Sequence, residues 1–163
     1  MERGRAPSLD RAIAIALLSL SGACSSPAGP SGGGPTTFSG EAVVVDDVPG
    51  SAFGFRIEVE GEFRDDGRLQ ADLTWRVVAP GTGTFGSQRP GILLEFFRSC
   101  PGWQCPGYAS AGPATEPPLS VAGDVHPASL YVVRIARRVS CGGCRIEYTL
   151  RIEHPSGSVK ARS

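Results

Sequence analysis

The sequence predicts an all-β protein: an antiparallel, jelly-roll-like β-sandwich of about seven strands, preceded by an export signal and a flexible linker. Three observations lead to this expectation. Several segments alternate apolar and polar residues, the pattern of a strand with one face buried and one in water. Glycine and proline are abundant, at 22 and 14 of 163 residues, and they punctuate these segments as turn residues do. No long stretch has the 3.6-residue period of an amphipathic helix.

The N-terminal 23 residues have the features of a bacterial export signal. Three arginines come first, and residues 12–20 then form an apolar run that is too short to span a bilayer. The following Leu-Ser-Gly-Ala-Cys resembles a bacterial lipoprotein cleavage box, in which the cysteine becomes the lipidated first residue. We therefore expect residues 1–23 to be removed and Cys24 to carry lipid. An ordinary secretory signal with a chance cysteine is the alternative.

The rest of the chain divides into a linker, one domain and a tail. Residues 24–40 are dominated by Gly, Pro and Ser, with no charge and one aromatic ring, so they predict a flexible spacer. The β-sandwich is expected at 41–154, with its first short strand at 43–45. Residues 155–163 are expected to be a polar tail.

Two clear alternations come next. Residues 53–59 place Phe and aliphatic side chains on one face and charged ones, such as Glu58, on the other. Residues 69–77 alternate in the same way, with Trp75 and Val77 on the apolar face. The Asp-Asp-Gly sequence between them favours a turn, so residues 53–78 predict a hairpin.

The second half of the domain predicts four more strands. Residues 92–97 are apolar on both faces and indicate a central strand, whereas 98–118 reads as a long irregular loop. Residues 119–122 and 130–136 are expected strands, the latter with Arg134 facing solvent. The clearest alternation of the chain, at 145–153, places four apolar groups inward and five polar ones in water.

The order of these apolar positions resembles a known family. The positions are Gly67-x-Leu69-x-Ala71-x-Leu73-x-Trp75, then 92–97, 119–121, 130–135 and 148–152. In this order the chain is similar, over residues 52–154, to the bacterial pre-peptidase C-terminal domain. That resemblance implies a β-sandwich module of exported proteins, often found beside secreted proteases and generally not itself the catalyst.

Four cysteines remain beyond Cys24. Cys100 and Cys105 form one close pair and Cys141 and Cys144 another. In the oxidising compartment that export implies, four cysteines normally form two disulfides, and either local or crossed pairing is open. We expect all four to lie at the same end of the sandwich. A zinc site or a redox pair is the alternative.

Few other residues suggest a site. Trp103 and Tyr108, in the predicted loop 98–118 that also holds Cys100 and Cys105, are possible binding residues, although Trp103 folding back over a disulfide is the simpler interpretation. His126 and His154 lie beside prolines and are expected to be solvated turn residues. No catalytic motif is present. We therefore expect no enzyme activity, no metal and no cofactor.

These features together predict a lipid-anchored protein of the cell envelope, in the outer membrane where the cell has one, facing the periplasm or the exterior. Its module is expected to be non-catalytic, either structural or binding a glycan or an envelope protein. The net charge of zero argues against a nucleic-acid partner. The alternative is an enzyme or a redox or zinc protein that uses the loops around Cys100, Cys105, Cys141 and Cys144.

Overall fold

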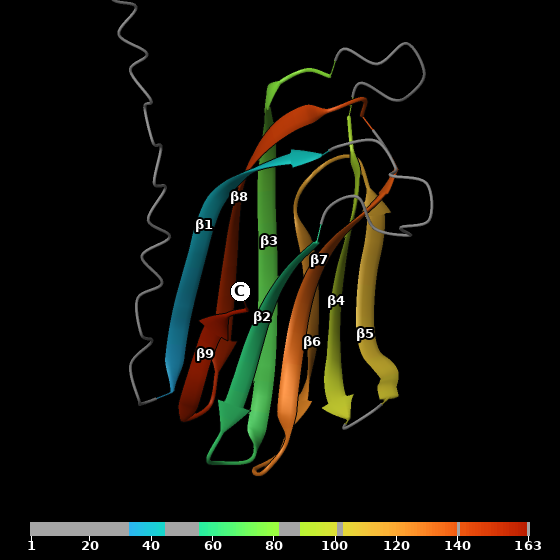
Figure 1. Cartoon of the computed structure of the whole chain (residues 1–163). Helices are drawn as coiled ribbons and strands as arrows, with labels where there is room; N and C mark the ends of the chain where they lie inside the picture. The colour runs from blue at the N-terminus through green and yellow to red at the C-terminus, as the bar shows by residue number, and fades with distance from the viewer. Residues whose placement is uncertain (1–32, 45–55, 82–88, 101–102, 140, 163) are drawn as a thin grey trace, which may run out of the picture.

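The protein is an antiparallel β-sandwich, as expected (Figure 1). The computed structural model describes residues 33–44, 56–81, 89–100, 103–139 and 141–162, with the side chains of 103–108 and 137–139 excepted. No helix able to cross a membrane occurs among these residues. The described strands are β1 (Gly34–Val44), β2 (Arg56–Phe63), β3 (Gly67–Ala79), β4 (Gly91–Cys100), β5 (Trp103–Ala114), β6 (Leu119–Val125), β7 (Leu130–Val139), β8 (Cys144–His154) and β9 (Gly157–Ala161).

The strand order is that of a jelly roll. One sheet has the order β1-β8-β3-β6 and the other β5-β4-β7-β2-β9. The pairs are nested along the chain, because β4 pairs with β5, β3 with β6, β2 with β7 and β1 with β8. Such a chain is one long hairpin of four strand pairs that has been rolled up into two sheets. The ninth strand extends the second sheet beyond β2.

The core lies between the two sheets and is formed by the apolar faces that the sequence predicts. Along β3 and β8, every second residue from Leu69 to Trp75 and from Ile146 to Ile152 points inward, and all but Tyr148 are fully buried. On the other sheet, Tyr131 on β7 stacks on Phe96 of β4, with ring centroids 5.7 Å apart.

The structure moves the N-terminal boundary of the domain. Strand β1 begins at Gly34, inside the segment expected to be a flexible linker up to residue 40. Thr36 and Phe38 are buried in the sandwich because β1 pairs with β8 along its whole length. The polar composition of residues 34–40 concealed this strand, because few of the residues at its inward positions are apolar.

Two further strands lie where none was expected, so the described residues form nine strands instead of about seven. Strand β5 occupies most of the predicted loop 98–118, paired with β4 through several register shifts. Glycine, proline and alanine at these positions hid its alternation. Strand β9 lies in the predicted polar tail, where Val159 is buried and pairs with Gly61 of β2.

The expected hairpin at 53–78 is wrong. Strands β2 and β3 belong to different sheets, so the Asp65-Asp66-Gly67 connection crosses the end of the sandwich instead of closing a hairpin. The backbone amide of Arg64 instead donates to the carbonyl of Ser156, 2.8 Å away, in the turn before β9. Residues 53–55 lie outside the described part of the chain.

Val77 was also expected in the core, but it is 36% exposed. The β3–β8 register shifts between Val77 and Ala79, which ends the strict alternation there.

Candidate functional site

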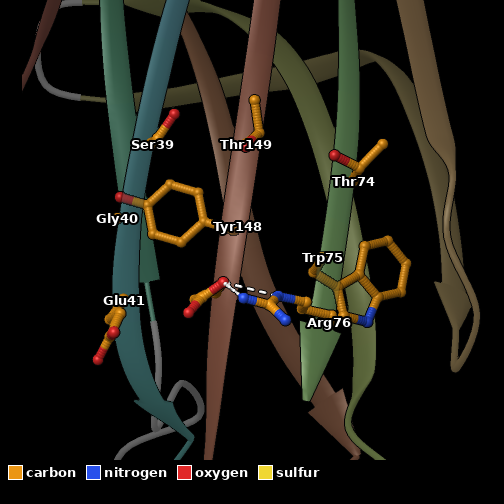
Figure 2. Close-up of a pocket in the computed structure, with 9 residues that line it drawn as sticks. Ser39, Gly40, Glu41, Thr74, Trp75, Arg76, Tyr148 and Thr149 are labelled. Atoms are coloured by element: carbon orange, nitrogen blue, oxygen red, sulfur yellow. Dashed lines mark hydrogen bonds and ion pairs between the residues drawn. The ribbon is translucent and has the colours of Figure 1, made fainter. Parts of the chain in front are cut away.

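A shallow hollow of about 500 Å³ crosses β1, β8 and β3, and we name it the β1–β8–β3 hollow. These strands lie side by side in the four-stranded sheet (Figure 2), and each contributes three consecutive residues to the hollow. The exposed side chains among these residues belong to the outward set of each strand, which faces away from the core. The hollow therefore lies on the outer face of the sheet, and its lining is organised in three rows that run across the strands.

The first row consists of hydroxyl groups. Ser39 on β1 pairs in register with Thr149 on β8, which pairs in turn with Thr74 on β3. All three side chains are exposed. Three neighbouring hydroxyls offer donors and acceptors that rotate to suit a partner.

The second row carries charge. Glu41 pairs in register with Glu147, and Glu147 pairs with Arg76. Arg76 binds Glu147 through two donors, with Nε 2.7 Å and Nη2 2.5 Å from Oε2 (Figure 2). Glu41 faces a like charge across the strands, an arrangement that is unfavourable by itself. Arg145, whose Nε lies 3.6 Å from Glu41 Oε2, offsets it.

The middle row is the floor of the hollow. The side chains of Tyr148 and Trp75 point into the sandwich, so this row shows mainly backbone to the outer face. Gly40, opposite Tyr148, is required for this packing. A Cβ at Gly40 would lie 2.9 Å from the Tyr148 hydroxyl and 3.2 Å from its ring. The tyrosine ring thus lies over β1 only because residue 40 has no side chain.

The structure resolves one cysteine pair. Cys141 and Cys144 form a disulfide, with Cα atoms 5.5 Å apart, at the start of β8. Local pairing is therefore correct for these two, and crossed pairing is excluded. Gly142 and Gly143 between them have φ angles of +66° and +83°, a conformation that glycine adopts without strain. Both cysteines are buried, at 4% and 0% exposure, and neither has a thiolate to give to a metal ion.

The expectation that all four cysteines share one end of the sandwich is wrong. Cys100 is disulfide-bonded as well, but it lies at the end of β4. Strands β4 and β7 are antiparallel neighbours, so the end of β4 lies beside Leu130, at the start of β7. Cys141 follows the other end of β7. The two sites therefore lie at opposite ends.

Other residues that the sequence singled out lie outside the described part of the structure, or have side chains that do. Cys24 precedes the described residues, and Cys105, Trp103 and Tyr108 are placed on β5 without their side chains. The possible binding role of Trp103 and Tyr108 thus stays a prediction.

The two histidines differ from each other. His126 is exposed, as expected, and its Nδ1 lies 2.7 Å from Asp66 Oδ1. His154 was expected in solvent but is 6% exposed, with Nδ1 2.7 Å from the Pro155 carbonyl and Nε2 3.0 Å from Thr36 Oγ1. Among the described residues, no group of three or more His, Cys, Asp or Glu side chains could hold a metal ion.

A charged cluster lies on the outer face of the other sheet. Arg134 Nε donates to Glu58 Oε1 at 2.8 Å, and Arg56 donates to the same oxygen. Arg162 Nη1 lies 3.4 Å from Glu58 Oε2, and Arg134 Nη1 lies 3.6 Å from Glu95 Oε2. Glu58 and Arg134 were expected in water, but both side chains are only 8% exposed.

This cluster has the character of a structural element. The guanidinium of Arg134 lies 4.4 Å above the centroid of the Phe97 ring, a cation–π contact. Burial alone would raise the pKa of Glu58, but hydrogen bonds from Arg56 and Arg134 outweigh it and hold that pKa below its ordinary value. A carboxylate that is fully engaged in this way joins strands and leaves no oxygen for chemistry.

The β1–β8–β3 hollow combines an open depression with exposed polar groups from three neighbouring strands, and we take it as the candidate site. Sequence reasoning missed it because its residues come from three distant segments, each of which reads as an ordinary solvated face. Its groups can bind a polar ligand through hydrogen bonds. No family model matches the chain, and no curated protein matches its sequence.

Proposed function

We propose that this protein is a non-catalytic binding module of the bacterial cell envelope, held to a membrane by lipid on Cys24. The observation that carries the binding role is the β1–β8–β3 hollow. It offers six outward polar or charged side chains, in register, on an otherwise regular sheet face. A partner at this face meets preformed hydrogen-bonding groups on rigid strands, which lowers the entropic cost of binding.

The anchor rests on the sequence. An apolar run of nine residues ends shortly before Cys24, and an uncharged segment follows it. Stable anchoring takes more than one acyl chain, which lipidated cysteines of bacterial lipoproteins carry. The pre-peptidase C-terminal resemblance supports the same role, because that family is a non-catalytic sandwich of exported proteins. In enterobacterial lipoproteins, which this signal resembles, an Asp directly after the lipidated cysteine is associated with retention in the inner membrane. This chain has Ser25 at that position, which favours the outer membrane where the cell has one.

The anchor and the binding role are tested separately. Fractionation of cells that express the full chain should place it with membranes, and Cys24→Ser should move it to the soluble fraction or leave it unprocessed. Membrane retention of a correctly cleaved Cys24→Ser protein would exclude lipid anchoring.

For the binding role, the purified protein is incubated with isolated cell-wall material and with envelope extract. The Thr74→Ala/Thr149→Ala variant should lose its binding partner in the cell-wall material, in the envelope extract, or in both. The Thr37→Ala variant, changed on the same face but outside the hollow, should bind as the parent does. Equal capture by both variants would exclude the hollow as the binding site.

A further inference from the structure

We infer that the ligand of the β1–β8–β3 hollow is a neutral, linear glycan that crosses the strands at right angles. This inference rests on the proposed binding role and specifies the chemistry of its ligand. Three properties of the hollow lead to it: the direction of its rows, its balance of charge, and the nature of its hydrogen-bonding groups.

The direction comes from the strand register. The hydroxyl row and the charged row each run across the strands and are two residues apart along them, a spacing of about 6.7 Å. Successive strands repeat the same groups at intervals of about 4.8 Å. The trough between the rows therefore runs perpendicular to β1, β8 and β3. A chain of flat rings laid in it meets a hydroxyl on one side and a charged group on the other at every strand.

The balance of charge selects against a charged polymer. Glu41 and Glu147 are the two carboxylates of the lining, and Arg76 and the neighbouring Arg145 are the two cations that contact them. A uronate or phosphate polymer would need a cation that is not already engaged in an ion pair, and a cationic polymer would need such an anion. A neutral ligand needs neither.

The hydrogen-bonding groups fit sugar hydroxyls. The Arg76–Glu147 pair places donors and acceptors next to each other, and vicinal hydroxyls can bind both at once because each hydroxyl donates and accepts. Ser39, Thr74 and Thr149 complete the opposite side with groups of the same dual character. The aromatic rings of the floor point inward, so binding relies on hydrogen bonds in water and is expected to be weak for each sugar.

The test is calorimetric titration of the purified full chain with short neutral linear oligosaccharides, and with uronate oligosaccharides of matched length. Neutral chains should bind, with an affinity that hardly changes between low and high salt, because no ion pair forms. Thr149→Ala should weaken binding about threefold to tenfold, since a neutral hydrogen bond is lost. Thr149→Ser should restore it, because the hydroxyl returns.

The charged row has a matched control on the same strand. Glu147→Gln should weaken binding by about tenfold, as expected when a charge-assisted hydrogen bond is lost. Glu153→Gln should leave binding unchanged. Glu153 is ion-paired on the same outer face, with Arg151 Nη2 2.7 Å away, but it does not line the hollow. Far-UV circular dichroism of each variant establishes that it is folded.

The outcomes separate this inference from the proposed function. Preference for uronate chains, or binding that Glu147→Gln and Glu153→Gln weaken equally, would overturn the glycan inference. If no oligosaccharide binds while hollow variants still lose capture of an envelope protein, the glycan inference fails and the binding role stands. If neither ligand class depends on the hollow, both fail.

Discussion

Trp75 and Val77 lie two residues apart on β3, and replacing each by alanine tests the packing of this strand. Alternation alone assigns both to the core. In the structure Trp75 is 6% exposed and packs in the central cluster, whereas Val77 is 36% exposed beside the register shift. We expect a large loss of stability for Trp75→Ala and a small one for Val77→Ala.

The magnitude for Trp75→Ala follows from its burial. A buried aromatic side chain removes about 150–250 Å² from water. At about 25 cal/mol per Å² this is worth about 4–6 kcal/mol, against about 3–5 kcal/mol for measured Trp-to-Ala changes in cores. We expect about 4 kcal/mol, a large part of the roughly 5–15 kcal/mol that stabilises a domain. Val77→Ala removes two partly exposed carbon atoms, so it should cost less than about 1 kcal/mol.

Urea unfolding followed by far-UV circular dichroism measures both free energies by linear extrapolation, and a common slope validates the comparison. If Trp75→Ala does not fold, Trp75→Phe keeps an aromatic ring and should show a smaller loss that is still larger than that of Val77→Ala. Equal losses at the two positions would refute the assignment of Trp75 to the core and Val77 to the surface. A loss below about 1 kcal/mol at Trp75 would do the same.

Three further predictions follow from named contacts. Because the pKa of Glu58 is held below its ordinary value, its carboxylate should stabilise the fold above the unfolded-state pKa, and this contribution should vanish as pH falls through the lower, folded-state pKa. Urea unfolding at several pH values should therefore show that the free energy of unfolding falls less on acidification for Glu58→Gln than for the parent. At neutral pH the variant should be less stable than the parent by about 3–5 kcal/mol. If the stability of the two proteins changes in parallel with pH, this prediction is contradicted. Gly123→Ala should cost about 1–3 kcal/mol in the same assay, since its Cβ would clash with the Phe96 ring; unchanged stability would mean that this contact is not tight. Peptide mapping without reduction should show Cys141 linked to Cys144, and a link from either one to another cysteine would contradict this. Replacing both by serine should lower the free energy of unfolding by about 2 kcal/mol.

Alternation of apolar and polar residues predicted which way side chains face with good accuracy. For β3 and β8 the inward sets from Leu69 to Trp75 and from Ile146 to Ile152 are those of the structure. The jelly-roll class was also predicted correctly. These successes share a cause, because the period of two is a local property of the strand and needs no knowledge of its neighbours.

Partners and boundaries are not local, and the sequence did not reveal them. The Asp65-Asp66-Gly67 segment has the composition of a hairpin turn, yet it joins strands of two different sheets. Strand β1 could be recognised only through β8, whose inward residues complete its sparse apolar face. The same dependence hid the candidate site. Ser39, Thr149 and Thr74 are unremarkable singly, and only the register places their hydroxyls in one row.

The nested strand pairing has a consequence for how the chain acquires its structure. Strand β5 follows β4 almost directly, so this hairpin closes a short loop and can form early, whereas β1 must wait for β8, which begins at Cys144. Each strand pair outward from the β4–β5 hairpin encloses a longer segment of chain, and the entropic cost of closing the loop rises with the length of that segment. A topology dominated by such distant pairings folds on a timescale of about milliseconds to seconds. We expect β1, which forms one end of each row of the hollow, to remain without its partner during that interval, so the hollow should be among the last features of the protein to assemble.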